Sequence, residues 1–344
     1  MFSLDVIRAF AALSVLAVHF FLHTGFYEIP SQGAVMAAAV VLRTQLMVCV
    51  PLFLVLTGYL QKEKVWCPGY IRGLIPLLVT YLLASMVCAG FRAFHLGGTW
   101  SPISWLRDIL AFSAAPYAWY IQQYIGLYLL IPFLNAAWSA LPGQKPRLAL
   151  VLTALLLTVG PSLNTLSLAL GFQLLPTGWE DGYFAAYYFV GCYLREYPPK
   201  CPWPWLFGAN LGAVTLGGLL HFCQAGGEPF GYFPPTHWNG VFTCLSTVSL
   251  FVLMSRLQLK GLPRPVRRGI SLIASLSLPL FLVSWVSDSL VYEKLTAALP
   301  AFSQRLFWFF PAVAAVLLLS LLLALAVFWY QQKLFSPRTN DPPP

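Results

Sequence analysis

The sequence predicts an all-α membrane protein, a polytopic bundle of about ten transmembrane helices with both termini in the cytoplasm. Of its 344 residues, 59% are hydrophobic and only 9% are charged, whereas soluble domains carry about 25% charged residues. Apolar runs of about 20 residues, long enough to cross a hydrocarbon core as helices, recur along the chain. The Lys and Arg residues are distributed unevenly between alternate connections, as in multi-pass membrane proteins.

The apolar runs give ten predicted spans. Their limits are 4–24, 35–60, 71–92, 117–139, 147–166, 183–195, 204–223, 239–255, 269–290 and 306–330. The sixth run is short for a span, and an extension back through the preceding GFQLLPTGWED stretch is the alternative. We treat residues 1–335 as one membrane domain and the Pro-rich residues 336–344 as a disordered cytoplasmic tail. The first run lacks the basic cluster and cleavage site of a signal peptide, so we expect a retained helix.

The basic residues define the predicted orientation. One set of alternate connections contains Lys62, Lys64, Arg72, Lys145, Arg147, Arg195, Lys200, Arg256, Lys260, Arg264, Arg267, Arg268, Lys333 and Arg338. The other set contains only Arg92, Arg107, Lys294 and Arg305. This asymmetry predicts that the first set and both termini are cytoplasmic. It also explains the net charge of +9 as a topology signal, so we expect membrane lipid and no nucleic acid as a partner.

Ionisable side chains inside the first predicted span indicate a functional groove, because such side chains are costly in lipid. Arg8 and His19 are eleven residues apart, which places them on one face of a helix about 16 Å apart along its axis. Asp5 precedes Arg8 by three residues, so local neutralisation of Arg8 is the structural alternative. For His19, the structural alternative is a buried, hydrogen-bonded neutral imidazole.

A metal site is not expected. His19 and His23 have the i, i+4 spacing of a helical metal-binding pair. No HExxH motif, cysteine pair or intramembrane carboxylate was identified to supply further ligands. The seven cysteines are scattered without a CxxC pair, which is typical of small core residues.

Two further spans carry polar and aromatic candidates. Arg43 lies in the second span and should point into the bundle, toward an anionic group or backbone carbonyls. The fourth span opens with Trp119 and Tyr120, which are typical of an interfacial aromatic belt. Gln122 and Gln123 follow, and two amides entering a span indicate either interhelical contacts or binding of a polar substrate.

In combination, these segments resemble the membrane acyltransferase 3 family. The first is SLDVIR, ending at Arg8, followed by ten residues and then His19. PLFLVLTGYL, YIRGLIP, AWYIQQYIGLYLLIPFLN and YYFVGCYL resemble later segments of the family in the same order, so the resemblance covers about residues 3–330. One departure is SLPLFLVSW, which places Ser284 where many members have a histidine.

The resemblance implies acyl transfer in a bacterial plasma membrane. The implied donor is cytoplasmic acyl-CoA, with acetyl-CoA as the expected form, and the acceptor is a hydroxyl of an envelope glycan, a lipid-linked sugar or a small molecule. We expect His19 to act as a general base or as a transient acyl carrier, and no metal to take part. The expected site residues are His19 and Arg8 for catalysis, Arg8, Arg43 and Arg72 for the donor, and Trp119, Tyr120 and Gln123 for the acceptor. The outer loops that carry Glu180, Asp181, Glu228 and His237 are expected to shape access.

Two other functional classes stay open at this point. A transporter or flippase also needs many spans and a polar groove, and acyltransferase-type modules fused to a serine racemase have been linked to serine uptake. The departure at Ser284 leaves room for a non-catalytic partner in envelope assembly. Product formation that depends on an acyl donor distinguishes catalysis from transport.

Overall fold

The computed structural model describes residues 2–97, 101–168, 171–259 and 261–335. Within these ranges the regular secondary structure is helical and contains no β-strand, so the all-α class is confirmed. The predicted tail, residues 336–344, lies outside the described residues. The helices are α1 (Phe2–His23), α2 (Gly33–Leu46), α3 (Cys49–Gln61), α4 (Pro68–Arg72), α5 (Leu74–His95), α6 (Pro102–Leu110), α7 (Trp119–Ala140), α8 (Gln144–Thr158), η1 (Gly160–Leu163), α9 (Asn164–Leu168), η2 (Glu180–Gly182), α10 (Tyr183–Glu196), α11 (Trp203–Ala225), η3 (Pro234–Thr236), α12 (Val241–Ser255), α13 (Arg264–Ser275), α14 (Ser277–Ala298), α15 (Phe302–Phe307) and α16 (Phe309–Phe335).

The chain is a multi-pass membrane protein, but the predicted count of ten spans is not confirmed. Six helical stretches of the described chain are long and apolar enough to cross a membrane, or eight if each of two bent pairs forms one span. The runs predicted at 117–139 and 183–195 form α7 and α10, which are not among these eight. Amide side chains lower the mean hydropathy of α7. The 14 residues of α10 rise about 21 Å, less than a hydrocarbon core of about 30 Å.

The predicted second span is present as one candidate span, Gly33–Gln61, in which α2 and α3 meet at residues 47–48. Other predicted spans are bent or shorter than expected. The run at 269–290 divides into α13 and α14, whose axes differ by 82°. The sixth helix begins at Tyr183 after the single turn η2, so it does not extend back through the preceding stretch.

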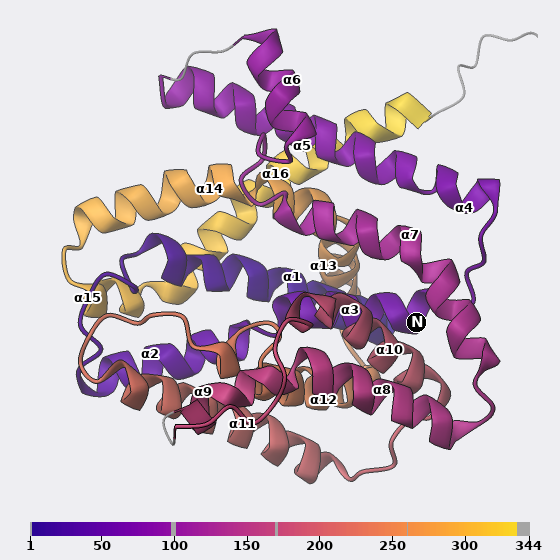
Figure 1. Cartoon of the computed structure of the whole chain (residues 1–344). Coiled ribbons are helices and arrows are strands. Elements are labelled where there is room, and N and C mark those ends of the chain that lie inside the picture. Colours follow the sequence, from indigo (N-terminus) through magenta and orange to yellow (C-terminus); the bar gives the residue numbers. More distant parts are fainter. Residues whose placement is uncertain (1, 98–100, 169–170, 260, 336–344) are drawn as a thin grey trace, which may run out of the picture.

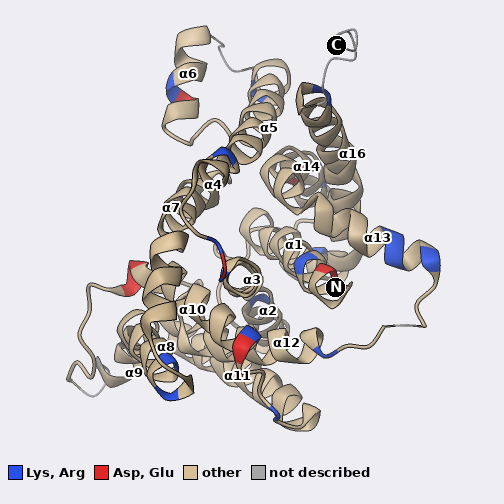
Figure 2. Cartoon of the chain, turned by 90° about the vertical axis from the view of Figure 1, so that its right-hand side faces the viewer, with Lys and Arg blue, Asp and Glu red and all other residues tan. Residues whose placement is uncertain are grey.

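Helix α1 is the central element of the bundle. It packs against α2, α3, α12, α13, α14 and α16. Figure 2 shows α4, α5 and α7 on one side of the molecule and α13, α14 and α16 on the other, with α1 and α3 between them. Residues of α1 therefore face elements from both sides of the bundle.

A contact between two glycines fixes α3 against α10. A Cβ atom on Gly191 of α10 would lie 2.0 Å from the carbonyl oxygen of Val55, and one on Gly58 of α3 would lie 1.9 Å from the carbonyl oxygen of Tyr188. Only glycine allows this backbone approach, which is typical of packed membrane helices. The contact holds α3 in place, and α3 contributes residues to the candidate site.

The start of α1 and helix α4 lie at one end of the bundle, which we call the N-terminal end (Figure 1). Helix α13 contacts the start of α1 there, through Ser271 and Asp5. Arg8 lies in the part of α1 near this end, and His19 lies near the opposite end. Lys and Arg residues are visible on α13 and α8 in the view onto the N-terminal end (Figure 2). The side of the membrane that this end faces stays a prediction.

Candidate functional site

His19 is joined to a carboxylate of another helix. Its side chain projects from the last turns of α1 and is largely buried, with 8% of the residue exposed. The Nδ1 atom lies 3.0 Å from Oδ2 of Asp288 in α14. An ionised carboxylate can only accept hydrogen bonds, so in the neutral form of His19 this contact places the proton on Nδ1 and leaves a lone pair on Nε2. The arrangement produces an imidazole that can accept a proton.

Tyr117 and His23 extend this pair into a chain of hydrogen bonds. The hydroxyl of Tyr117 donates to the same Oδ2 atom of Asp288 at 2.7 Å, and Nε2 of His23 lies 2.7 Å from that hydroxyl. Because the tyrosine proton points to the carboxylate, Nε2 of His23 is the donor to the tyrosine oxygen. The rings of Tyr117 and His19 are 4.0 Å apart between centroids. One hydrogen bond to Asp288 and the ring contact with Tyr117 therefore hold the His19 imidazole, and the hydrogen bonds among Asp288, Tyr117 and His23 hold these partners in place.

Asp288 is fully buried, and one of its oxygens is not paired. Its Oδ1 atom has no hydrogen-bond partner among the described residues, and neither does the buried hydroxyl of the neighbouring Ser287. An unsatisfied buried polar atom costs about 1–3 kcal/mol, but unpaired buried atoms also occur elsewhere in the described chain, as at Gln45 and Ser320. What distinguishes Asp288 is therefore the contact of its Oδ2 atom with His19 and Tyr117.

Ser284, for which the sequence resemblance implied a histidine, does not join this network. It lies one helical turn before Asp288 and is fully buried. Its hydroxyl donates to the carbonyl oxygen of Phe281 in its own helix at 2.9 Å. The acidic side chain that contacts His19 instead comes from Asp288, the next turn of α14.

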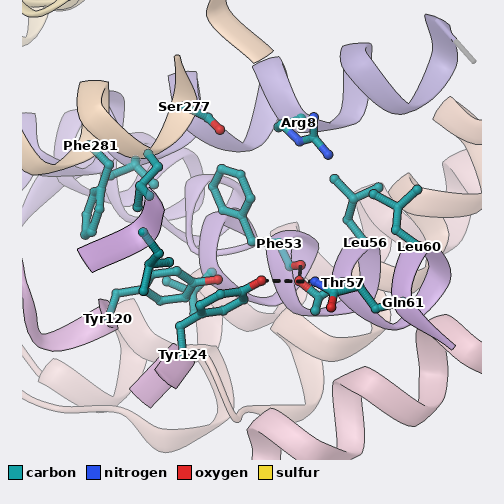
Figure 3. A pocket seen from close by; sticks show the side chains of 14 residues that line it. Arg8, Phe53, Leu56, Thr57, Leu60, Gln61, Tyr120, Tyr124, Ser277 and Phe281 are labelled. Atoms are coloured by element: carbon teal, nitrogen blue, oxygen red, sulfur yellow. Dashed lines mark hydrogen bonds between the residues drawn. The ribbon is translucent and has the colours of Figure 1, made fainter. Parts of the chain in front are cut away.

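A cavity of about 210 Å³ opens between α1, α3, α5, α7 and α14. We call it the Arg8 cavity, and Figure 3 shows the Arg8 guanidinium directed into it from α1, across from the rings of Tyr120 and Tyr124. Most of the other lining side chains are apolar, as in the case of Phe53 and Leu56. Arg8 has no hydrogen bond or ion pair with any residue that the structure describes, Asp5 included. An unpaired guanidinium in a mainly apolar cavity is suited to an amphipathic anion.

The Arg8 cavity ends close to His19 without reaching it. Its lining extends along α1 as far as Val15, one turn before His19. The ring of Phe281, which lines the cavity, lies 6.0 Å from the ring of Tyr117 and nearly parallel to it, at 21°. Phe281 and Tyr117 together therefore separate the cavity from the imidazole.

A second cavity of about 570 Å³ brings two of the predicted acceptor residues together. Trp119 and Gln123 line this Trp119 cavity, whereas Tyr120 lines the Arg8 cavity instead. The ring of Trp119 is stacked on that of Trp238, with centroids 4.5 Å apart. The rings of Tyr120 and Phe184, one from the lining of each cavity, are 6.2 Å apart. The two cavities are thus separated by aromatic side chains.

Loop residues give the Trp119 cavity an acidic rim. Glu180, Asp181 and His237 line it, whereas Glu228 is not part of this lining; a role in access stays a prediction. Burial, together with the charges of Glu180 and Asp181, raises the pKa of Tyr232, which also lines the cavity. The hydroxyl of Tyr232 therefore stays protonated at neutral pH and can donate a hydrogen bond.

The other two residues predicted to bind the acyl donor lie away from the Arg8 cavity. Arg43 is buried in α2, and its Nε atom donates to the Tyr27 hydroxyl at 2.9 Å. A longer contact of 3.5 Å joins the same guanidinium to the hydroxyl of Thr236. Arg72, at the end of α4, is exposed at the N-terminal end. The structure therefore brings Arg8, but neither Arg43 nor Arg72, to the lining of this cavity.

No group of three or more His, Cys, Asp or Glu side chains within the described ranges has a metal-binding arrangement. The rings of His19 and His23 are 6.4 Å apart between centroids and nearly perpendicular. Both imidazoles are directed to Tyr117 and Asp288 through hydrogen bonds.

Two members of the site, Asp288 and Tyr117, were not predicted from the sequence. Asp288 lies inside the predicted run 269–290, so the interpretation that no intramembrane carboxylate accompanies His19 was wrong. A single acid within an apolar run was the signal that could have identified it. Tyr117 stands at the predicted start of the fourth span, where aromatic residues are common. Nothing in the sequence distinguishes it from the aromatic residues that follow.

Comparison with known protein families supports the resemblance noted in the sequence. Residues 1–327 match the acyltransferase 3 family model, described as an acyltransferase domain. No match was found among curated proteins or solved structures.

Proposed function

The chain belongs to the acyltransferase 3 family, and we propose that it transfers an acetyl group from acyl-CoA to a hydroxyl of a cell-envelope glycan, a lipid-linked sugar or a related small molecule. The single observation that carries this proposal is the hydrogen bond of 3.0 Å between His19 and Asp288. It leaves Nε2 of His19 free to act as a base. In this proposal the protein lies in a bacterial plasma membrane, with the N-terminal end of the bundle in the cytoplasm.

The proposed reaction is a direct transfer with His19 as general acid and base. Nε2 of His19 takes the proton of the acceptor hydroxyl while the acceptor oxygen bonds to the thioester carbon. The carbon–sulfur bond then breaks, and the sulfur leaves as a thiol with the proton returned by His19. The carboxylate of Asp288 stabilises the imidazolium that exists between these steps, and Tyr117 holds the carboxylate in position. A transient acyl group on His19 is the other route open to the same imidazole.

The Arg8 cavity is the proposed donor site. A CoA thioester combines phosphates with a long and less polar arm, which matches one guanidinium in a mainly apolar cavity. Arg8 acts here by binding the donor and by placing its thioester on the His19 face of α1. Arg72, exposed at the N-terminal end, is suited to contact a phosphate outside the cavity. The Phe281 ring has to turn for the thioester to reach His19.

The acceptor is proposed to bind in the Trp119 cavity. Aromatic rings stack on sugar faces and amides pair with hydroxyls, which suits Trp119 and Gln123 to a glycan. Tyr120 lies in the partition between this cavity and the Arg8 cavity. In the proposed complex it orients the acceptor hydroxyl toward the donor.

Donor-dependent labelling of a glycan tests this proposal. The purified full chain is incubated with radiolabelled acetyl-CoA and a crude envelope-glycan extract, and the label transferred to the extract is counted. Transfer above the rate without protein is expected. In parallel, proteoliposomes without any acyl donor are tested for accumulation of labelled serine and glycan fragments. Accumulation there, with no transfer by folded protein under several acyl donors, would replace the acyltransferase proposal with transport.

A further inference from the structure

Helix α13 is a separate amphipathic helix at the N-terminal end of the bundle. It spans Arg264–Ser275 and meets α14 at an angle of 82°. Figure 2 shows it projecting from the bundle beside the N-terminus, with its basic residues on the outer part. On a helical wheel its arginines and serines occupy one side, and Val266 and Ile273 occupy the other. Such a helix is suited to the boundary between headgroups and acyl chains.

One side of α13 is fixed to α1. Ala274 is buried, and the hydroxyl of Ser271 donates to Asp5 at 3.2 Å. The guanidinium carbon of Arg267 lies 4.7 Å from the centroid of the Phe2 ring. These contacts, together with the packing of Ile273 against the core, attach the helix to the bundle and leave the residues of its first turns exposed.

The free surface carries a stripe of positive charge without neutralising partners. Arg264, Arg268 and Leu272 follow one another at intervals of four residues and therefore lie along one side of the helix. Both arginines are exposed and have no hydrogen bond or ion pair within the described part of the chain. The sequence contains no Asp or Glu between Glu228 and Asp288. The local charge is therefore not compensated by the protein itself.

Helix α13 also carries exposed apolar side chains, Leu272 beside the arginines and Val266 on the opposite side. Val266 and Leu272 are 46% and 41% exposed, which favours insertion into the apolar edge of a bilayer over contact with water. Basic residues next to apolar ones at a membrane surface attract anionic headgroups. The positive charge and the exposed apolar residues thus both favour a bilayer that contains anionic phospholipids as the partner.

We propose that α13 lies in the membrane interface and that Arg264 and Arg268 bind the phosphate groups of anionic phospholipids in the surrounding bilayer. This lipid site is distinct from the proposed donor site. Helix α13 leads directly into Ser277 of α14, which lines the Arg8 cavity. A lipid-bound α13 therefore also fixes one wall of that cavity.

Lipid binding by the full chain tests the proposal. Wild-type protein in a neutral detergent is titrated with phosphatidylglycerol or with phosphatidylcholine, and the bound lipids are counted by native mass spectrometry. The test variant combines Arg264→Gln with Arg268→Gln. The matched control combines Arg107→Gln with Lys294→Gln, which removes two exposed charges from α6 and α14.

Wild type is expected to bind phosphatidylglycerol in preference to phosphatidylcholine, and added salt should reduce the preference. The test variant should bind phosphatidylglycerol on the order of tenfold to thirtyfold more weakly, and the control should resemble wild type. Equal binding by the test variant, or an equal loss in the control, would overturn the proposal. A loss of CoA binding by the test variant in the neutral detergent, measured by equilibrium dialysis, would also overturn it, because the arginines would then serve the donor.

Discussion

The imidazole of His19 and the carboxylate of Asp288, 269 positions apart in the sequence, form a hydrogen bond of 3.0 Å inside the helix bundle. Helices α1 and α14 pack against each other along this contact. Tyr117 donates to the same carboxylate oxygen at 2.7 Å. Three elements therefore determine the orientation of one imidazole, and the tautomer of that imidazole depends on the charge of Asp288.

Replacing Asp288 by Asn should reverse the tautomer of His19. The amide of Asn donates where the carboxylate accepts, so the proton of His19 moves to Nε2 and the base is lost. We expect kcat for acyl transfer to fall by about 10²- to 10⁴-fold, with little change in CoA affinity. Ser287→Ala, at the neighbouring buried position, is the control and should retain activity. A kcat close to wild type in folded Asp288→Asn protein would remove Asp288 from the mechanism.

Ser284 should be dispensable for activity. Its hydroxyl is bonded to the carbonyl oxygen of Phe281 in its own helix, and the acidic partner of His19 lies one turn further on. We expect Ser284→Ala to keep both the rate of acyl transfer and the melting temperature near the wild-type values. A large loss of rate with unchanged stability would show that this position takes part in the reaction.

Arg8 and Arg43 should have different roles, Arg8 in binding the acyl donor and Arg43 in stabilising the fold. Arg8→Gln should raise KM for acetyl-CoA by about tenfold to a hundredfold, since a hydrogen bond to a charged group contributes about 1.5–3 kcal/mol. Arg43→Gln breaks contacts with Tyr27 and Thr236, so it should lower the melting temperature and leave KM for the donor unchanged. Steady-state kinetics and thermal unfolding of both variants measure this split. The opposite pattern, with KM raised only by Arg43→Gln, would place the donor elsewhere.

The contact between α3 and α10 should not tolerate a methyl group. Gly191→Ala places a Cβ atom 2.0 Å from the carbonyl oxygen of Val55, and overpacking of this kind costs about 1–3 kcal/mol or more. Gly126→Ala is the matched control, because a Cβ atom on Gly126 of α7 meets no atom within 4 Å. The melting temperature in detergent should fall for Gly191→Ala only. Equal melting temperatures would mean that the two helices can separate without loss of stability.

The sequence was sufficient for the helical class and for the first helix, because composition and hydropathy determine both. It was insufficient for the span count. Helix α7 carries Gln122 and Gln123 within an otherwise apolar run, and α10 is too short to cross alone. The bend between α13 and α14 was also hidden, since the run 269–290 reads as one apolar segment. Packing around α1 determines where such a run bends, and hydropathy does not contain that information.

The candidate site was only partly predictable for a related reason. The spacing of Arg8 and His19 on one helix is a local property, so it can be inferred from the sequence. The contact of His19 with Asp288 depends on how α1 and α14 pack, and no local pattern records it. The division of Trp119 and Tyr120 between two cavities likewise results from the rotation of α7 within the bundle. Neighbouring residues on a helix point in different directions, and the sequence does not show which cavity lies in each direction.

Acyl transfer by His19→Ala beside wild type tests most directly whether His19 is the catalytic base. Radiolabelled acetyl-CoA and the envelope-glycan extract serve as substrates, and transferred label and thioester hydrolysis are both measured. His95→Ala, at an exposed position of α5, is the matched control, and the melting temperature verifies that each variant is folded. We expect His19→Ala to lose transfer by about 10²-fold or more and His95→Ala to keep it. Full transfer by folded His19→Ala protein would exclude His19 as the catalytic base.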